Sequence, residues 1–329
     1  MKLSREDLER MIKEETEDLL GEKANPAKFD PARFPLKLSD VDPMQSKIAV
    51  SHGHSKYDQD PNDDEINVDY KPSGVAAVQD LSPSQSSMNI GKAMTFVLHM
   101  IDPTSKMEPG GDLGAFISND KYIMDGHHRW IATAMVDPSK SVGGYEVDFP
   151  GEQLVAVLNA MTKGQFGVMK GKPASGGFDQ FKEKPIRDML TTMAKGGISQ
   201  ETVPDTFNPK WQGRTAEQVM KLLQDWTGKQ GEDAVESAVT KMVNNLGGIN
   251  MSTPSWAPER PDMPVIDEPD IPAAVKALDK GHVDVNKPYY QGEDEPGMAP
   301  PMSESRNLVS ISKERLQEII KEELQNRKR

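Results

Sequence analysis

Residues 120–136 constrain the fold more than any other part of this chain, because a polar cluster there is enclosed between two apolar runs. Residues 122–124 have the composition of a short buried strand, and the apolar positions of residues 130–135 have the spacing of the inner face of a helix. The segment Asp125-Gly126-His127-His128-Arg129 lies between them. The sequence therefore predicts a strand that turns at a glycine directly into a helix.

A turn of this kind predicts an anion site. The first N–H groups of the helix have no partner within the helix and converge on one point, which attracts phosphate above other anions. His127, His128 and Arg129 would add side-chain donors and positive charge. Asp125 would cap the helix, orient a histidine or help to hold a divalent metal. We therefore expect these four side chains to be catalytic, and Gly126 and its three successors to bind phosphate.

The same residues also allow a purely structural interpretation. In that case Asp125 only caps the helix, and His128 is a packed histidine whose hydrogen bonds are satisfied. Four polar groups in succession at such a turn are costly to bury without a ligand. We therefore favour the ligand site, and the metal, if there is one, stays undetermined.

The segment from Ile123 to Ala132 resembles the signature of the ParB/sulfiredoxin-like superfamily. Upstream, Val78-Gln79-Asp80-Leu81-Ser82-Pro83-Ser84-Gln85 is similar to the first strand and the Pro-x-Gln element of that superfamily. The resemblance implies one small mixed-sheet domain over residues 73–162, in which a Gly-x-x-Arg turn cradles nucleotide phosphates. It also implies that Gln85 joins the phosphate-binding residues and that the cofactor is ATP, ADP or CTP with Mg²⁺.

Members of the superfamily have several activities, and the residues at the turn and upstream of it indicate which of these this chain can have. Sulfiredoxin chemistry needs a cysteine in the turn, and the chain has none. Free-serine kinases of this fold use a glutamate base near the upstream proline, where Gln85 stands and cannot accept a proton. Partitioning proteins carry a DNA-binding helical module, but residues 179–247 lack basic clustering. What remains is a protein that binds a nucleotide, or a phosphoester hydrolase such as a nuclease or nucleotide hydrolase.

Composition divides the chain around this domain, for which we predict an α+β fold. Residues 25–72 are rich in Pro, Asp and Asn and are expected to form an extended acidic arm. Residues 163–250 open with a Gly/Lys loop and then have helical periodicity, and residues 251–309 have the proline-rich acidic composition of a linker, with one helix expected near 271–278. Within the domain the patterns predict strands at 75–78 and 146–149, a hairpin over 115–124, and helices over 90–101 and 152–161.

The two ends of the chain resemble each other. Residues 3–15 align without gaps on residues 311–323, with seven of the thirteen positions identical. Both copies predict amphipathic helices, over 1–24 and 310–329, that begin at a serine cap and carry a narrow apolar stripe. The helices would either pack on their own domain or dock on protein partners through residues 3–20 and 311–324.

The docking interpretation supplies a second function hypothesis. The terminal helices are similar to the Lys-Glu-Glu helices at the ends of marine bacteriophage proteins, which implies a virion structural or assembly protein that uses the ParB-like domain as a scaffold. Oligomers are compatible with this interpretation.

The overall composition argues against several other functional classes of protein. No segment approaches the length of a bilayer span, so we expect no membrane partner. The net charge of −13 and the lack of long basic runs disfavour sequence-independent DNA binding. The absence of cysteine fits a cytoplasmic setting, or the virion in the second hypothesis. His52-Gly53-His54 could offer two metal ligands, but without a partner cluster it is interpreted as a solvated loop.

Overall fold

The computed structural model describes residues 29, 31, 34–51, 66–173, 176–209, 213–267, 270–279 and 283. The chain divides into two units, Met1–Pro288 and Tyr289–Arg329, and every described residue belongs to the first. The predicted terminal helices over 1–24 and 310–329, the docking segments within them, and His52 and His54 therefore lie outside the described residues.

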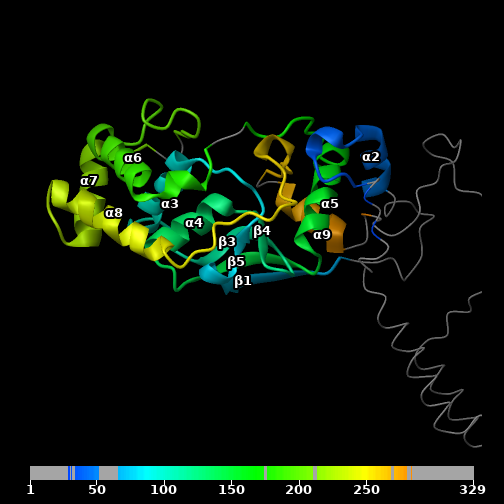
Figure 1. Cartoon of the computed structure of the whole chain (residues 1–329), viewed down its shortest axis with the longest axis horizontal. Helices are drawn as coiled ribbons and strands as arrows, with labels where there is room; N and C mark the ends of the chain where they lie inside the picture. Colours follow the sequence, from blue (N-terminus) through cyan, green and yellow to red (C-terminus); the bar gives the residue numbers. More distant parts are fainter. Residues whose placement is uncertain are drawn as a thin grey trace, which may run out of the picture. The chain divides into compact units, whose positions relative to one another are not determined.

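A five-stranded mixed sheet forms the centre of the fold, with the strand order β1-β5-β3-β4-β2. The β1/β5 and β3/β4 pairs are antiparallel, whereas β3/β5 and β2/β4 are parallel. Figure 1 shows the four labelled strands side by side in this order. The strands span Val68–Ala77 (β1), Ser82–Pro83 (β2), Gly111–Ser118 (β3), Tyr122–Asp125 (β4) and Ser141–Val147 (β5).

Helices cover both faces of the sheet. Successive residues of a strand point to opposite faces, and on β3 Ala115 and Ile117 join one buried apolar cluster while Phe116 joins another. The first cluster contains α3 (Ile90–Met100), α4 (His127–Val136), α6 (Glu183–Gly196), α7 (Ala216–Thr227) and α8 (Glu232–Leu246). The second contains α2 (Pro43–Ser51), α5 (Gly151–Gly164) and α9 (Ile271–Asp279). Short 3₁₀ turns occur at Leu38–Asp40, Val78–Asp80, Phe178–Phe181 and Arg260–Asp262.

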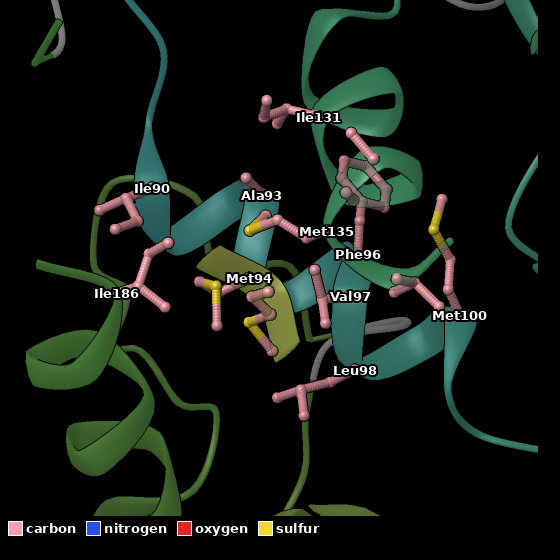
Figure 2. Packing of buried hydrophobic residues seen from close by; sticks show 14 of the residues in the cluster. Ile90, Ala93, Met94, Phe96, Val97, Leu98, Met100, Ile131, Met135 and Ile186 are labelled. Atoms are coloured by element: carbon pink, nitrogen blue, oxygen red, sulfur yellow. The ribbon is translucent and has the colours of Figure 1, made fainter. Parts of the chain in front are cut away.

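Helix α3 is the centre of the first cluster. Figure 2 shows Met135 of α4 and Ile186 of α6 beside the side chains of α3, among them Met94 and Val97. All four of these side chains have 0% exposure. The packing fixes α3 against α4, and these two helices carry Lys92 and the residues His127, His128 and Arg129 of the site described below.

The predicted α+β class is confirmed, with a sheet followed by a helical region. Helices at 90–101 and 152–161 and the helix near 271–278 form within three residues of their predicted ends, and the hairpin forms with its first strand beginning four residues earlier than predicted, at Gly111. The strands predicted at 75–78 and 146–149 are shifted, since β1 covers Val68–Ala77 and β5 covers Ser141–Val147.

The described parts of the predicted arm and linker contain buried residues. Phe34 and Leu38 are buried at 1% exposure, and α2 packs on α5 within the second cluster. Helix α2 begins with a standard signal, since the Asp42 carboxylate accepts hydrogen bonds from two first-turn N–H groups and Pro43 follows it. Met263, in the predicted linker, is 4% exposed. The few apolar residues of these polar segments are therefore sufficient to pack the segments against the rest of the protein.

Among the described residues, no helix combines the length and the apolar character that crossing a bilayer requires.

Candidate anion site at the start of α4

The predicted strand–glycine–helix turn is confirmed. Strand β4 ends at Asp125, Gly126 has φ 97° and ψ 8°, and α4 begins at His127. A Cβ at Gly126 would lie 3.1 Å from the Cβ of Ala115 on β3, so both the left-handed backbone and the space require glycine. The indole N–H of the buried Trp130 donates to the carbonyl of Val78 at 3.0 Å and fixes α4 on the sheet edge.

Asp125 does not cap α4, because the capping position is Gly126 and no side chain bonds to the helix N-terminus. Its carboxylate lies instead 3.6 Å from the guanidinium of Arg129, one turn along the helix. No hydrogen bond joins Asp125 to either histidine among the described residues, and no cluster of three metal-ligating side chains occurs among them either. Of the three predicted roles for Asp125, capping is therefore wrong, and its main contact is an ion pair.

His127 is 4% exposed and holds the chain that follows β2. Its Nε2 accepts a hydrogen bond from the backbone N–H of Ser84 at 3.2 Å, and the Ser84 hydroxyl donates to the carbonyl of Ile123 at 2.6 Å. Burial, with a smaller contribution from the positive charge of Arg260, lowers the pKa of His127 to about 3. The ring is neutral, and its proton resides on Nδ1 because Nε2 is an acceptor.

His128 is 8% exposed and holds the start of α3. Its Nε2 accepts from the backbone N–H of Asn89 at 3.1 Å, and Asn89 caps α3 by accepting from the N–H of Lys92 at 2.9 Å. Burial and then the nearby cations, Lys92 first, hold the pKa of His128 well below its usual value. His128 is thus the packed, hydrogen-bonded histidine of the structural interpretation. Neither histidine adds the positive charge that the sequence led us to expect.

The predicted residues converge on one cavity of about 850 Å³. Asp125, Gly126, His127, His128, Arg129 and Gln85 all line it. Four further cations that the sequence did not single out also line it: Lys92, Lys106, Lys172 and Arg260. Cations therefore outnumber carboxylates five to two in the lining, in a chain with a net charge of −13. The cavity is therefore a positively charged region in a chain whose net charge is negative.

Lys92 shows how strongly the cations act on one another. Burial lowers the pKa of its ammonium, and the neighbouring charges of Lys172, Arg260 and Arg129 lower it further, against the opposing effect of Asp125. The burial of an ammonium group among three other cations is electrostatically unfavourable. A bound anion would relieve this repulsion.

Residues 259–267, the covering segment, form one wall of the cavity. The chain that leaves α8 runs back toward α5 (Figure 1), and in the covering segment Val265 N–H donates to Thr162 Oγ1 of α5 at 3.0 Å and Asn159 Nδ2 of α5 donates to the Asp262 carbonyl at 3.1 Å. The segment adds Arg260 and Asp267, and Asp267 pairs with Lys172 at 3.2 Å. It also supplies apolar lining, and the apolar lining as a whole consists of Phe96, Met107, Met124, Met263, Pro264, Val265 and Ile266.

The chain matches no family model, no curated protein and no solved structure. The resemblance of the turn to the ParB/sulfiredoxin-like superfamily therefore stays a prediction based on the residues quoted for it.

Proposed function

We propose that this chain is a nucleotide-binding protein and that the cavity at the start of α4 holds the phosphates of the nucleotide. The ligand would be ATP, ADP or CTP as its Mg²⁺ complex, as the superfamily resemblance implies. The N–H groups that follow Gly126 would contact phosphate together with the guanidinium of Arg129. Gln85, which is 8% exposed and lines the cavity, would add an amide donor.

The observation that carries the proposal is the excess of cations around a cavity of ligand size. Small-molecule sites typically enclose about 300–1,000 Å³ and combine apolar walls with a few placed polar groups. This cavity has a volume of about 850 Å³, an apolar wall and five cationic side chains. A helix N-terminus at the same place adds favourable partial charge for an anion.

The geometry favours binding over hydrolysis. The Nε2 lone pairs of His127 and His128 are already occupied by backbone N–H groups, so neither ring offers a base there. Both lining carboxylates, Asp125 and Asp267, are in ion pairs. The two histidines instead retain Nδ1–H groups, which are donors suited to phosphate oxygens.

Calorimetric titration of the full chain with ATP, ADP and CTP in the presence of Mg²⁺ tests the proposal. We expect saturable binding of at least one nucleotide, and binding at least about tenfold weaker for Arg129→Ala, since a charge-assisted hydrogen bond contributes about 1.5–3 kcal/mol. Arg187→Ala is the matched control, because Arg187 on α6 pairs with Glu236 on α8 and is not in the cavity lining. The absence of binding to every nucleotide would overturn the proposal.

The alternative, a phage virion or assembly protein that docks through residues 3–20 and 311–324, concerns residues outside the described ranges. It stays a prediction from the sequence.

A further inference from the structure

We propose that the cavity binds a terminal phosphate group with two negative charges more tightly than a phosphodiester, which has one. Lys92 is the residue that interacts with the second negative charge. This inference rests on the proposed function and deepens it, because it names the chemical class of the ligand's anchoring group. The ligand is then a phosphomonoester, or a nucleotide with an unesterified terminal phosphate. The inference excludes a polynucleotide backbone as the ligand, because each of its phosphodiesters carries only one negative charge.

The first step of the argument is that the protein already uses both carboxylates of the lining. Asp125 lies 3.6 Å from Arg129, and Asp267 lies 3.2 Å from Lys172. Each carboxylate therefore offsets one neighbouring cation, and neither forms an ion pair with Lys92. Within the lining, the counter-charge for Lys92 would therefore come from a ligand.

The second step concerns Lys92 itself. Among the described residues, no carboxylate lies within ion-pair distance of its ammonium group, which lies over the Phe96 ring at 6.0 Å from the centroid. The charges that face it are those of Arg129 on α4, Lys172 on the loop after α5, Arg260 on the covering segment and Asp125 on β4. Three of these four are positive. An ammonium in this position gains from every negative charge that enters.

The third step compares the charge of the ligand with that of the lining. Cations exceed carboxylates in the lining by more than one, so a monoanion would leave positive charge facing positive charge across the cavity. A terminal phosphate carries close to two charges at neutral pH because its second pKa is about 6. The Nδ1–H groups of the neutral His127 and His128 rings would then bind its oxygens without adding further charge.

Competitive calorimetry with ADP and its β-methyl ester tests this inference, because the ester removes one charge and keeps the base, the sugar and both phosphorus atoms. At pH 7.5 we expect the wild-type chain to bind ADP about tenfold or more tightly than the ester. Lys92→Gln should weaken ADP binding about tenfold and reduce the preference for ADP over the ester to about twofold or less. Lys195→Gln, which removes an exposed lysine of α6 outside the lining, should keep both the affinity and the preference.

The outcomes separate this inference from the proposed function. Equal affinity for ADP and its ester would overturn the inference and leave nucleotide binding in place. A preference that persists in full in Lys92→Gln would show that the methyl group is rejected by its size, which also overturns the inference. No binding of either compound by the wild type would overturn both proposals. Lys92→Met, which keeps the apolar stem beside Phe96, provides the same comparison if the glutamine variant unfolds.

Discussion

The Nε2 atom of His128 accepts a hydrogen bond from the backbone N–H of Asn89 at 3.1 Å, so the first turn of α4 holds the N-terminus of α3. Asn89 in turn caps α3 through the N–H of Lys92. Because this connection fixes the start of α3, it also positions the ammonium-bearing side chain of Lys92 at the cavity. The histidine acts on the anion site through the position of a lysine.

The buried histidines predict a specific loss of stability in acid. Their pKa values are lowered in the folded state, to about 3 for His127, while in the unfolded chain they are near 6.5. The unfolded state therefore binds more protons below pH 6.5, and the free energy of unfolding falls as the pH falls below about 6. For His127 this slope is about 1.4 kcal/mol per pH unit between about pH 6 and pH 4, and His128 changes it in the same direction.

Urea unfolding of the wild type, His127→Gln and His128→Gln over this pH range measures the effect. A glutamine oxygen can accept the same backbone hydrogen bond but does not titrate, so each variant should have a shallower slope, by about 1.4 kcal/mol per pH unit for His127→Gln. Profiles that run parallel to the wild type would contradict the account of two buried neutral rings.

Gly126→Ala should destabilise the chain and weaken phosphate binding. The new Cβ would require a positive φ and would lie 3.1 Å from Ala115 Cβ, which together cost about 1–3 kcal/mol. The matched control is Gly248→Ala, where a Cβ meets nothing within 4 Å, and thermal unfolding compares the two. Equal melting temperatures for both variants would show that the turn tolerates a side chain.

Asp125→Asn should tighten the binding of ADP in the absence of metal. The substitution removes the carboxylate that competes with phosphate for Arg129, and a several-fold gain is expected, since partly exposed ion pairs contribute about 0.2–1 kcal/mol. Calorimetry in the presence of a chelator measures this directly. Weaker binding would show instead that the Asp125 carboxylate itself supports the ligand.

Thr162→Val should loosen the covering segment. The Thr162 hydroxyl accepts from the Val265 N–H and donates to the Leu158 carbonyl, so its loss leaves a buried N–H without a partner at a cost of about 1–3 kcal/mol. Hydrogen exchange should become faster at Val265, and ADP affinity should fall. Thr240→Val removes a hydroxyl that bonds only within α8 and serves as control. Unchanged exchange at Val265 would contradict the role assigned to Thr162.

The core of the site was accessible from the sequence because it is local. A short apolar run, a glycine and the apolar spacing of residues 130–135 specify a strand, a left-handed turn and a helix within the range of neighbouring residues. The state of the histidines was not accessible, because their partners, Ser84 and Asn89, are about forty positions away along the chain. The cations were missed for the same reason, since Lys92, Lys172 and Arg260 meet only after folding.

The same distinction between local and long-range interactions explains which parts of the fold could be predicted. The helices of residues 179–247 and the hairpin follow local periodicity and were predicted. The burial of residues 34–51 and of the covering segment was not predicted, because their apolar residues are few and separated by proline and acid. Their burial depends on tertiary partners such as Asn159, which donates to the carbonyls of Leu36 and Asp262. The pair Asp42-Pro43 was a local signal that could have identified α2.

The most direct test of the central claim is a crystal structure of the full chain with saturating ADP and Mg²⁺. The account predicts phosphate density in the cavity at the start of α4, with an oxygen within hydrogen-bond distance of Lys92 Nζ, of the Arg129 guanidinium, and of N–H groups that follow Gly126. A nucleotide bound elsewhere, or a cavity without phosphate at saturating ligand, would contradict it.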